Sequence, residues 1–102
     1  MKNYYEILGI PENATAEEIT KKGRKVVQQH SVDHIFAGKT MGVDYTEDQW
    51  RRANARYAEV IEAYQILKDQ TSRKEYDSRL SAFRRQKAQE AAAEQARRDA
   101  EA

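Results

Sequence analysis

Two histidines and an aspartate lie close together near the middle of the chain, and all three are residue types that bind metals. His30 and His34 stand four residues apart, with Asp33 between them. On a helix this spacing places two imidazoles on one face, as zinc sites require. No further ligand has a matching position, however, and we expect the segment after Gln29 to lie beyond a helix end. The histidines are therefore expected to be surface or capping residues, and no metal or other cofactor is predicted.

No other group of residues has the spacing of a catalytic site. The chain contains no cysteine, which excludes disulfides, thiolate metal sites and cysteine nucleophiles. No Ser/His/Asp set or carboxylate pair has a convincing arrangement. Gly38-Lys39-Thr40 resembles the end of a phosphate-binding loop, but the upstream glycine and strand of such a loop are missing. We therefore expect a binding protein and not an enzyme.

A cluster of cations is the strongest candidate for a binding surface. Lys21, Lys22, Arg24 and Lys25 fall within about one and a half helical turns. An exposed cluster of this kind speeds the encounter with an acidic partner and orients it, with a marked dependence on salt. The ordinary alternative is a solvated helix face with no partner. Binding of nucleic acid through these cations and Arg84–Lys87 is disfavoured, because 18 Lys and Arg against 17 Asp and Glu leave a net charge of only +1.

The elements that must position these residues are helices, because the chain has one proline and four glycines. The apolar stretch Tyr4–Leu8 is followed by Gly9 and is typical of a short helix with a glycine cap. Thr15 and Glu18 have capping-box spacing and predict a helix over Ala16–Gln29.

A second long helix is predicted over Trp50–Leu67, after a cap formed by residues 46–49. Its apolar side chains recur at heptad-like spacing: Trp50, Ala53, Tyr57, Val60, Ile61, Tyr64 and Leu67. Two such helices, joined by a loop over 31–47, form an antiparallel hairpin. We expect the hairpin to bury five large side chains, which are Ile19, Val26, Tyr57, Ile61 and Tyr64. Gly23 costs about 1 kcal/mol relative to alanine in the middle of a helix, and so requires a packing reason.

The composition changes toward the end of the chain. A segment with Tyr76 and Leu80 predicts a short fourth helix, but alanine is the only apolar residue after Phe83. Residues 81–102 have high helix propensity and nothing large to bury, so we expect a charged, alanine-rich extension that is a solvated helix or a frayed tail. No run approaches the roughly 18 apolar residues of a membrane span. A cytoplasmic protein with a module over residues 1–80 is the expectation.

These motifs, in this order, resemble the J-domain family of DnaJ-like co-chaperones over about residues 3–80. Asn3–Ile10 looks like the family's D-Y-Y-x-x-L-G-V start, and Thr15–Lys22 is similar to the opening of its second helix, with Arg24 and Lys25 at its basic positions. Two later motifs, F-x-x-I-x-E-A-Y-x-x-L-x-D and R-x-x-Y-D, are matched by Tyr57, Val60, Glu62, Ala63, Tyr64, Leu67 and Asp69 and by Arg73, Tyr76 and Asp77.

The resemblance implies an all-α fold, a J-domain-type antiparallel hairpin of helices two and three with short first and fourth helices. It also implies that the basic residues Lys21, Lys22, Arg24 and Lys25 meet an acidic surface on a DnaK-type ATPase chaperone. The family's His-Pro-Asp signature, which promotes ATP hydrolysis by that chaperone, would fall in the loop after helix two.

The chain departs from the family at this signature. The slot of His-Pro-Asp holds Ser31, Val32 and Asp33, and His30 lies one place earlier, where the family usually has an aromatic residue. The resemblance therefore implies partner binding through the cations and this segment, with weak or absent ATPase stimulation. The alternative is a J-fold scaffold or adaptor among the subunits of a larger assembly, with the chaperone link lost. Gly23 also stands where the family has an aromatic residue.

Overall fold

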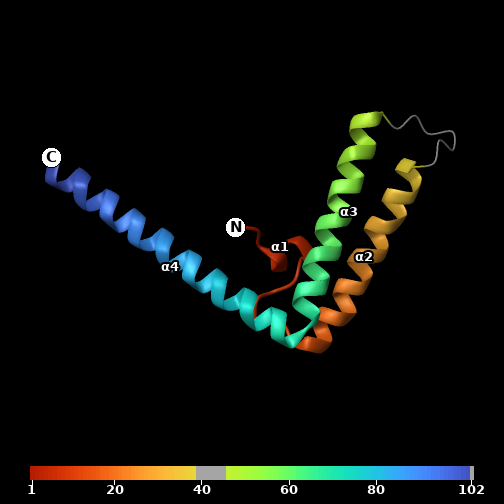
Figure 1. Ribbon diagram of the computed structural model, residues 1–102, viewed down its shortest axis with the longest axis horizontal. Helices are drawn as coiled ribbons and strands as arrows, with labels where there is room; N and C mark the ends of the chain where they lie inside the picture. The colour runs from red at the N-terminus through yellow and green to blue at the C-terminus, as the bar shows by residue number, and fades with distance from the viewer. Residues whose placement is uncertain (39–45, 102) are drawn as a thin grey trace.

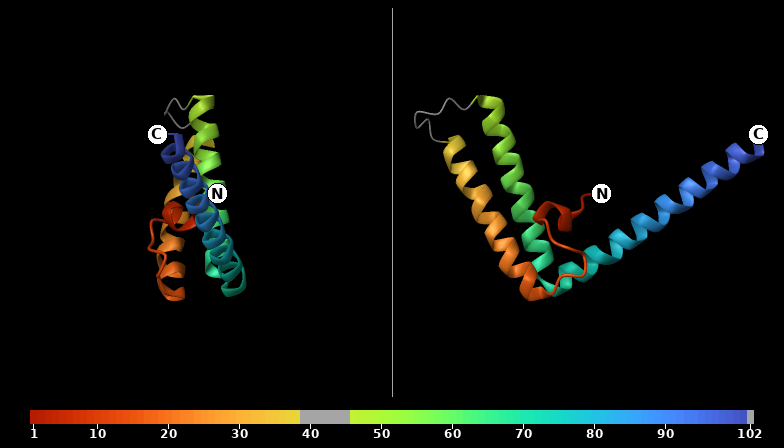
Figure 2. Two further views of the ribbon diagram at one scale, coloured as in Figure 1. Left: turned by 90° about the vertical axis from the view of Figure 1, so that its left-hand side faces the viewer. Right: turned by 180° about the vertical axis from the view of Figure 1, so that it is seen from behind.

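The computed structural model describes residues 1–38 and 46–101, and for residues 33–38 it describes the backbone alone. Over these residues the chain forms α1 (Tyr4–Leu8), α2 (Ala16–Gly38), α3 (Glu47–Lys68) and α4 (Gln70–Glu101). Helices α2 and α3 pack side by side as an antiparallel hairpin, and α4 leaves its base at an angle, so the molecule has the shape of a V (Figure 1). Helix α1 lies inside the V against α3 (Figure 2). The predicted all-α hairpin is confirmed.

The predicted glycine cap of α1 and the predicted cap of α3 are both present, and α1 has in addition an N-terminal cap, Asn3, that was not predicted. The Asn3 side chain accepts from two backbone N–H groups of α1, and Gly9 closes that helix in the left-handed conformation, with φ of 66°. At the start of α3, Gln49 N donates to Thr46 Oγ1 at 3.2 Å and Thr46 N donates to Gln49 Oε1 at 2.9 Å. This pair is a complete capping box.

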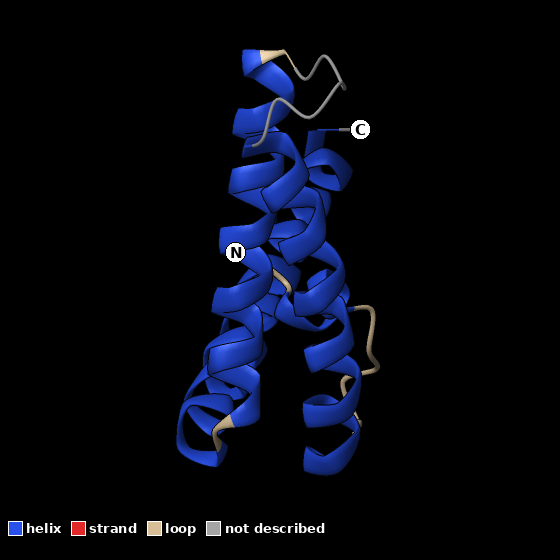
Figure 3. Ribbon diagram, turned by 90° about the vertical axis from the view of Figure 1, so that its right-hand side faces the viewer, coloured by secondary structure: helices blue, strands red, loops and turns tan. Residues whose placement is uncertain are grey.

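Helix α2 is longer than predicted. It continues to Gly38 and does not end at Gln29, so the expectation of a loop from residue 31 is wrong for residues 31–38. The physical reason is the absence of a helix breaker: residues 24–37 contain neither glycine nor proline, and Val32 keeps the backbone N–H that a proline would lack. Figure 3 shows the continuous helix. Residues 39–45 of the expected loop lie outside the described residues.

The core lies at the closed end of the hairpin, where α1 meets the two long helices and the start of α4. Its largest fully buried side chains are Tyr5, Leu8, Ile19 and Leu67. Of the five side chains predicted to be buried, only Ile19 is fully so. The others, Val26, Tyr57, Ile61 and Tyr64, are partly buried.

Trp50 does not belong to this core. Its side chain is 40% exposed, so the interpretation of the heptad-like apolar residues of α3 as core, from Trp50 onward, is wrong for Trp50. The reason is its position in the first turn of α3, at the open end of the hairpin and far from α1 (Figure 1).

Helix α4 is also longer than predicted. The short fourth helix and the extension form one helix of 32 residues. Tyr76 and Leu80 are buried against the hairpin and Phe83 is half-buried, whereas residues 84–101 are all exposed. Of the two alternatives for the extension, the structure shows a solvated helix that projects from the hairpin (Figure 1). Within the described residues, no helix combines the length and the apolar character needed to cross a bilayer.

Candidate partner-binding site

The four predicted cations lie on the solvent side of α2. Lys21, Lys22, Arg24 and Lys25 are all exposed, and helical geometry spreads them over an arc of roughly 160°. Ile19 and the other residues that contact α3 and α1 lie on the opposite side. No described carboxylate forms an ion pair with any of the four. We call this group the basic face.

A shallow groove runs beside the basic face. It has a volume of about 340 Å³ and is lined by Ile10 and Pro11 of the α1–α2 connection and by Glu18, Lys21, Lys22 and Lys25 of α2. Arg24 does not line it. No pattern in the sequence predicts this groove, because it depends on how the connection folds back against the helix.

Arginines of α4 hold that connection in place. Arg73 donates to the backbone oxygen of Ala14 at 2.8 Å and to that of Glu12 at 3.2 Å. Arg84 donates to both carboxylate oxygens of Glu12 at 2.7 Å, and these hydrogen bonds hold the pKa of Glu12 below its usual value of 4.5. The first half of α4 therefore fixes the segment that carries one wall of the groove.

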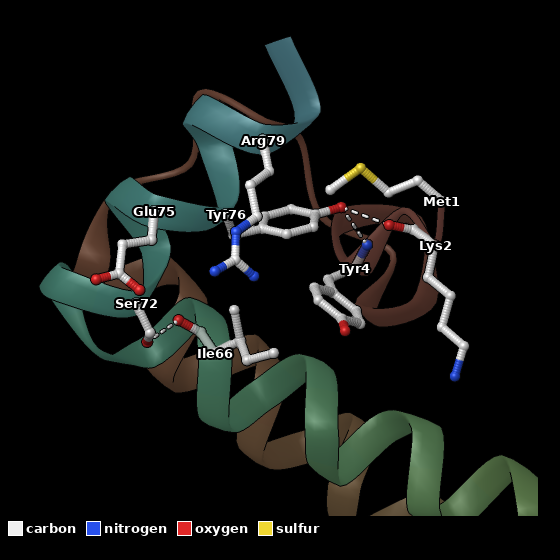
Figure 4. A pocket seen from close by; sticks show the side chains of 8 residues that line it. All are labelled: Met1, Lys2, Tyr4, Ile66, Ser72, Glu75, Tyr76 and Arg79. Atoms are coloured by element: carbon white, nitrogen blue, oxygen red, sulfur yellow. Dashed lines mark hydrogen bonds between the residues drawn. The ribbon is translucent and has the colours of Figure 1, made fainter. Parts of the chain in front are cut away.

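Tyrosines of α1 complete the attachment of α4. Tyr5 Oη donates to Asp77 Oδ1 at 2.5 Å and accepts from Arg73 Nε at 3.1 Å. Burial, and then the hydrogen bond to Asp77, raise the pKa of Tyr5. Tyr76 Oη accepts from Tyr4 N at 3.0 Å and donates to the backbone oxygen of Lys2 at 2.7 Å, as Figure 4 shows. These contacts hold α1 and the N-terminal segment against α4.

A second cavity lies inside the V, away from the basic face. It has a volume of about 310 Å³ and lies between the N-terminus, α1, α3 and α4 (Figure 4). Its walls include the rings of Tyr4 and Tyr76, whose centroids are 4.6 Å apart, and the side chain of Arg79. Tyr76 Oη makes both of its hydrogen bonds with backbone groups of the N-terminal segment. This hydroxyl therefore anchors that segment to α4.

Ser31, Val32 and Asp33, which occupy the His-Pro-Asp positions of the family, lie on α2 and not in a loop. Ser31 is half-buried, and Val32 is 50% exposed. Val32 follows Lys21 by 11 residues, which is close to three full turns, so it extends the solvent side that carries Lys21 and Lys25. Asp33 has a helical backbone, and its side chain lies outside the described residues.

The histidine pair gives no support for a metal centre. His30 is half-buried on α2, and the side chain of His34 lies outside the described residues. Among the described side chains, no group of three or more His, Cys, Asp or Glu residues could hold a metal ion.

The fold and the basic face together define a class: a module of J-domain type whose described residues form four helices, with the basic face on α2, the first helix of the hairpin. The chain is homologous to the DnaJ/J-domain family over about four fifths of its length. It is 43% identical to Chaperone protein DnaJ 2 of Synechocystis sp. over 86 residues, which are 83% of this chain and 24% of that protein.

Two further relatives show similar likeness. Chaperone protein DnaJ of Hydrogenobacter thermophilus is 39% identical over 77 residues, which cover 76% of this chain and 18% of that protein. DnaJ homolog subfamily B member 9 of Mus musculus is 37% identical over 77 residues, covering 76% of this chain and 29% of that protein. The chain thus spans less than a third of the length of these relatives. No protein-family model matches the chain.

Proposed function

We propose that this chain is a non-enzymatic co-chaperone module that docks on a DnaK-type ATPase chaperone through its basic face. Two observations support the proposal: homology to proteins named as DnaJ chaperones, and four exposed cations without a described carboxylate partner. Cations in this state keep their field for an acidic partner, because no pair with a described carboxylate neutralises them.

The proposal includes weak or absent stimulation of ATP hydrolysis. The single observation that carries this part is the continuity of α2 through Ser31 and Val32, the positions at which the family has His and Pro. Ser31 offers no imidazole, and a helix holds its own backbone N–H and C=O groups in internal hydrogen bonds. A partner that recognises a loop at this place therefore meets neither the imidazole nor the loop backbone that it requires.

Single-turnover ATP hydrolysis by a DnaK-type chaperone tests the proposal. We expect little stimulation by the wild-type chain and a clear rise with the double variant Ser31→His, Val32→Pro. The rise should be abolished when Asp33→Asn is added. Strong stimulation by the wild-type chain would contradict the proposed deficit and would point to His30 in the missing role.

A scaffold or adaptor role is the second candidate, and α4 is the observation that favours it. Residues 84–101 form an exposed helix that contributes nothing to the core, which suits a surface used in a larger assembly. We propose residues 1–80 as the docking module and residues 81–102 as its extension, although α4 crosses this boundary without a break. Pull-downs with a DnaK-type chaperone, with and without ATP, separate the two roles, because a pure scaffold would show no nucleotide-dependent capture.

A further inference from the structure

The groove beside the basic face combines an apolar floor with a cationic rim. Ile10 is 7% exposed and Pro11 is exposed, and both lie against the α2 residues Lys21, Lys22 and Lys25. Lysine side chains have four-carbon stems that cover apolar surface while the ammonium group stays in water. We expect the stems of these lining lysines to supply apolar walls and their ammonium groups to stand at the rim.

The charges at the rim are unbalanced. Three lysines face one carboxylate, that of Glu18, and no ion pair joins Glu18 to any of them. A ligand with several negative charges would gain attraction from all three ammonium groups at once. An apolar group between those charges would in addition be removed from water against Ile10 and the lysine stems.

The shape of the site favours a peptide over a lipid surface. The groove is concave, and its volume of about 340 Å³ is at the lower end of the range for ligand pockets, roughly 300–1,000 Å³. A membrane-binding surface requires large apolar side chains that protrude into the bilayer interface. The exposed large apolar side chains of the described residues are Met1, Val32 and Trp50, and none of them lines the groove.

We propose that this groove is a socket for one aliphatic side chain of an acidic peptide segment, held by Lys21, Lys22 and Lys25 above Ile10 and Pro11. The inference rests on the proposed function, since it specifies what kind of segment the basic face would receive. It adds an apolar anchor to a surface that would otherwise recognise charge alone.

Two blocked peptides, Asp-Asp-Leu-Asp-Asp and Asp-Asp-Ser-Asp-Asp, test the socket by NMR titration of the full 102-residue chain at low salt. We expect the leucine peptide to bind about tenfold more tightly than the serine peptide, because it alone buries an aliphatic side chain. It should also shift the methyl resonances of Ile10. Equal affinities, or unperturbed Ile10 methyl groups, would overturn the proposal.

A matched set of variants separates the stem of a lysine from its charge. Lys25→Met keeps an unbranched apolar stem, whereas Lys25→Ala removes both stem and charge. We expect both variants to weaken the serine peptide equally, and Lys25→Ala to weaken the leucine peptide by a further factor of about three. Arg24 lies outside the groove, so Arg24→Met and Arg24→Ala should not differ from each other with either peptide. If the affinity for the leucine peptide differs between the Met and Ala variants by a similar factor at Lys25 and at Arg24, the groove is not the binding site.

The result distinguishes the socket from the proposed function. If a DnaK-type chaperone binds the chain but the two peptides bind alike, the socket is wrong and docking stands. If the leucine peptide binds more tightly but no DnaK-type chaperone binds, the socket stands, and the acidic segment that it receives belongs to another protein. Vesicles of phosphatidylcholine and phosphatidylserine that shift the Ile10 methyl groups more than either peptide would overturn the proposal in favour of a lipid surface.

Discussion

The ring of Tyr64 on α3 occupies the space that a side chain at Gly23 of α2 would need. A Cβ atom added to Gly23 would stand 2.5 Å from Tyr64 Cδ2 and 2.9 Å from Tyr64 Cε2. The absence of a side chain at residue 23 thus lets the two long helices approach where an aromatic ring lies between them. This contact is the packing reason that a glycine in the middle of α2 requires.

Gly23→Ala should destabilise the protein by up to about 2 kcal/mol in urea unfolding. Alanine gains about 1 kcal/mol in helix propensity, but overpacking a tight contact costs roughly 1–3 kcal/mol, and here the obstacle is a ring and not a flexible chain end. The repulsion is expected to win because the ring is itself packed against the core cluster.

The same substitution in a Tyr64→Ala background provides the control. Tyr64→Ala alone should cost about 2–3 kcal/mol, at or below the usual range for aromatic truncation, because Tyr64 is only half-buried. With the ring gone, Gly23→Ala should become stabilising, since only the propensity gain remains. If the sign of the Gly23→Ala effect is unchanged, the glycine is not required by Tyr64.

The sequence predicted the elements whose signals are local. The glycine cap at Gly9, the cap at Thr46 and the apolar stripe of α3 depend on residues within a few positions of each other. The end of α2 was missed although its signal was present: the first glycine after Gly23 is Gly38, and no proline intervenes. Gly38, Gly42 and the irregular apolar pattern suggested a loop over the whole of residues 31–47, but no residue before Gly38 interrupts the helix.

Contacts between distant residues could not be predicted in this way. Arg73 was recognised as part of a family motif, but its hydrogen bonds to the backbone of Glu12 and Ala14 join residues about 60 positions apart. The groove at Ile10 depends on those bonds, because they fold the connection against α2. Sequence spacing carries no information on such a contact until the fold is known.

The ion pair between Glu12 and Arg84 should make stability depend on pH. The pKa of Glu12 is lowered in the folded protein, so its contribution is present above the ordinary pKa of 4.5 and is lost as pH falls through the lower, folded value. The difference in unfolding free energy between wild type and Glu12→Gln should therefore be positive at pH 7 and shrink toward zero below pH 4.5. An Arg84→Gln background should remove the difference at every pH, and a difference that persists there would assign it to another partner.

Charge reversal on the basic face should weaken binding to a DnaK-type chaperone. Lys21→Glu with Arg24→Glu replaces attraction by repulsion, so association should slow and its dependence on salt should flatten. The matched control is Arg85→Glu with Arg97→Glu, which makes the same change in net charge on the exposed part of α4. Equal loss of binding by both double variants would mean that the chaperone responds to net charge and not to this face.

The conformation of residues 31–33 should limit ATPase stimulation more than the missing imidazole does. Val32→Pro removes a helical N–H and clashes with the preceding turn, so α2 should end near residue 31. The cost to global stability should be about 1 kcal/mol or less, because the core residues of α2 that the structure describes all precede residue 31. Amide exchange should show faster opening of residues 33–38 in this variant.

The two single variants, Ser31→His and Val32→Pro, separate the effect of the missing imidazole from that of the helical backbone. Ser31→His alone should leave stimulation low, since its imidazole is held on a continuous helix, where a partner that requires a loop cannot use it. Val32→Pro alone should raise stimulation modestly, and the double variant should exceed the sum of the two, because the imidazole is presented correctly only after the helix ends. Single-turnover ATP hydrolysis measures all three against wild type. If Ser31→His by itself restores strong stimulation, the helical conformation of this segment is no obstacle, and the deficit lies in the side chain alone.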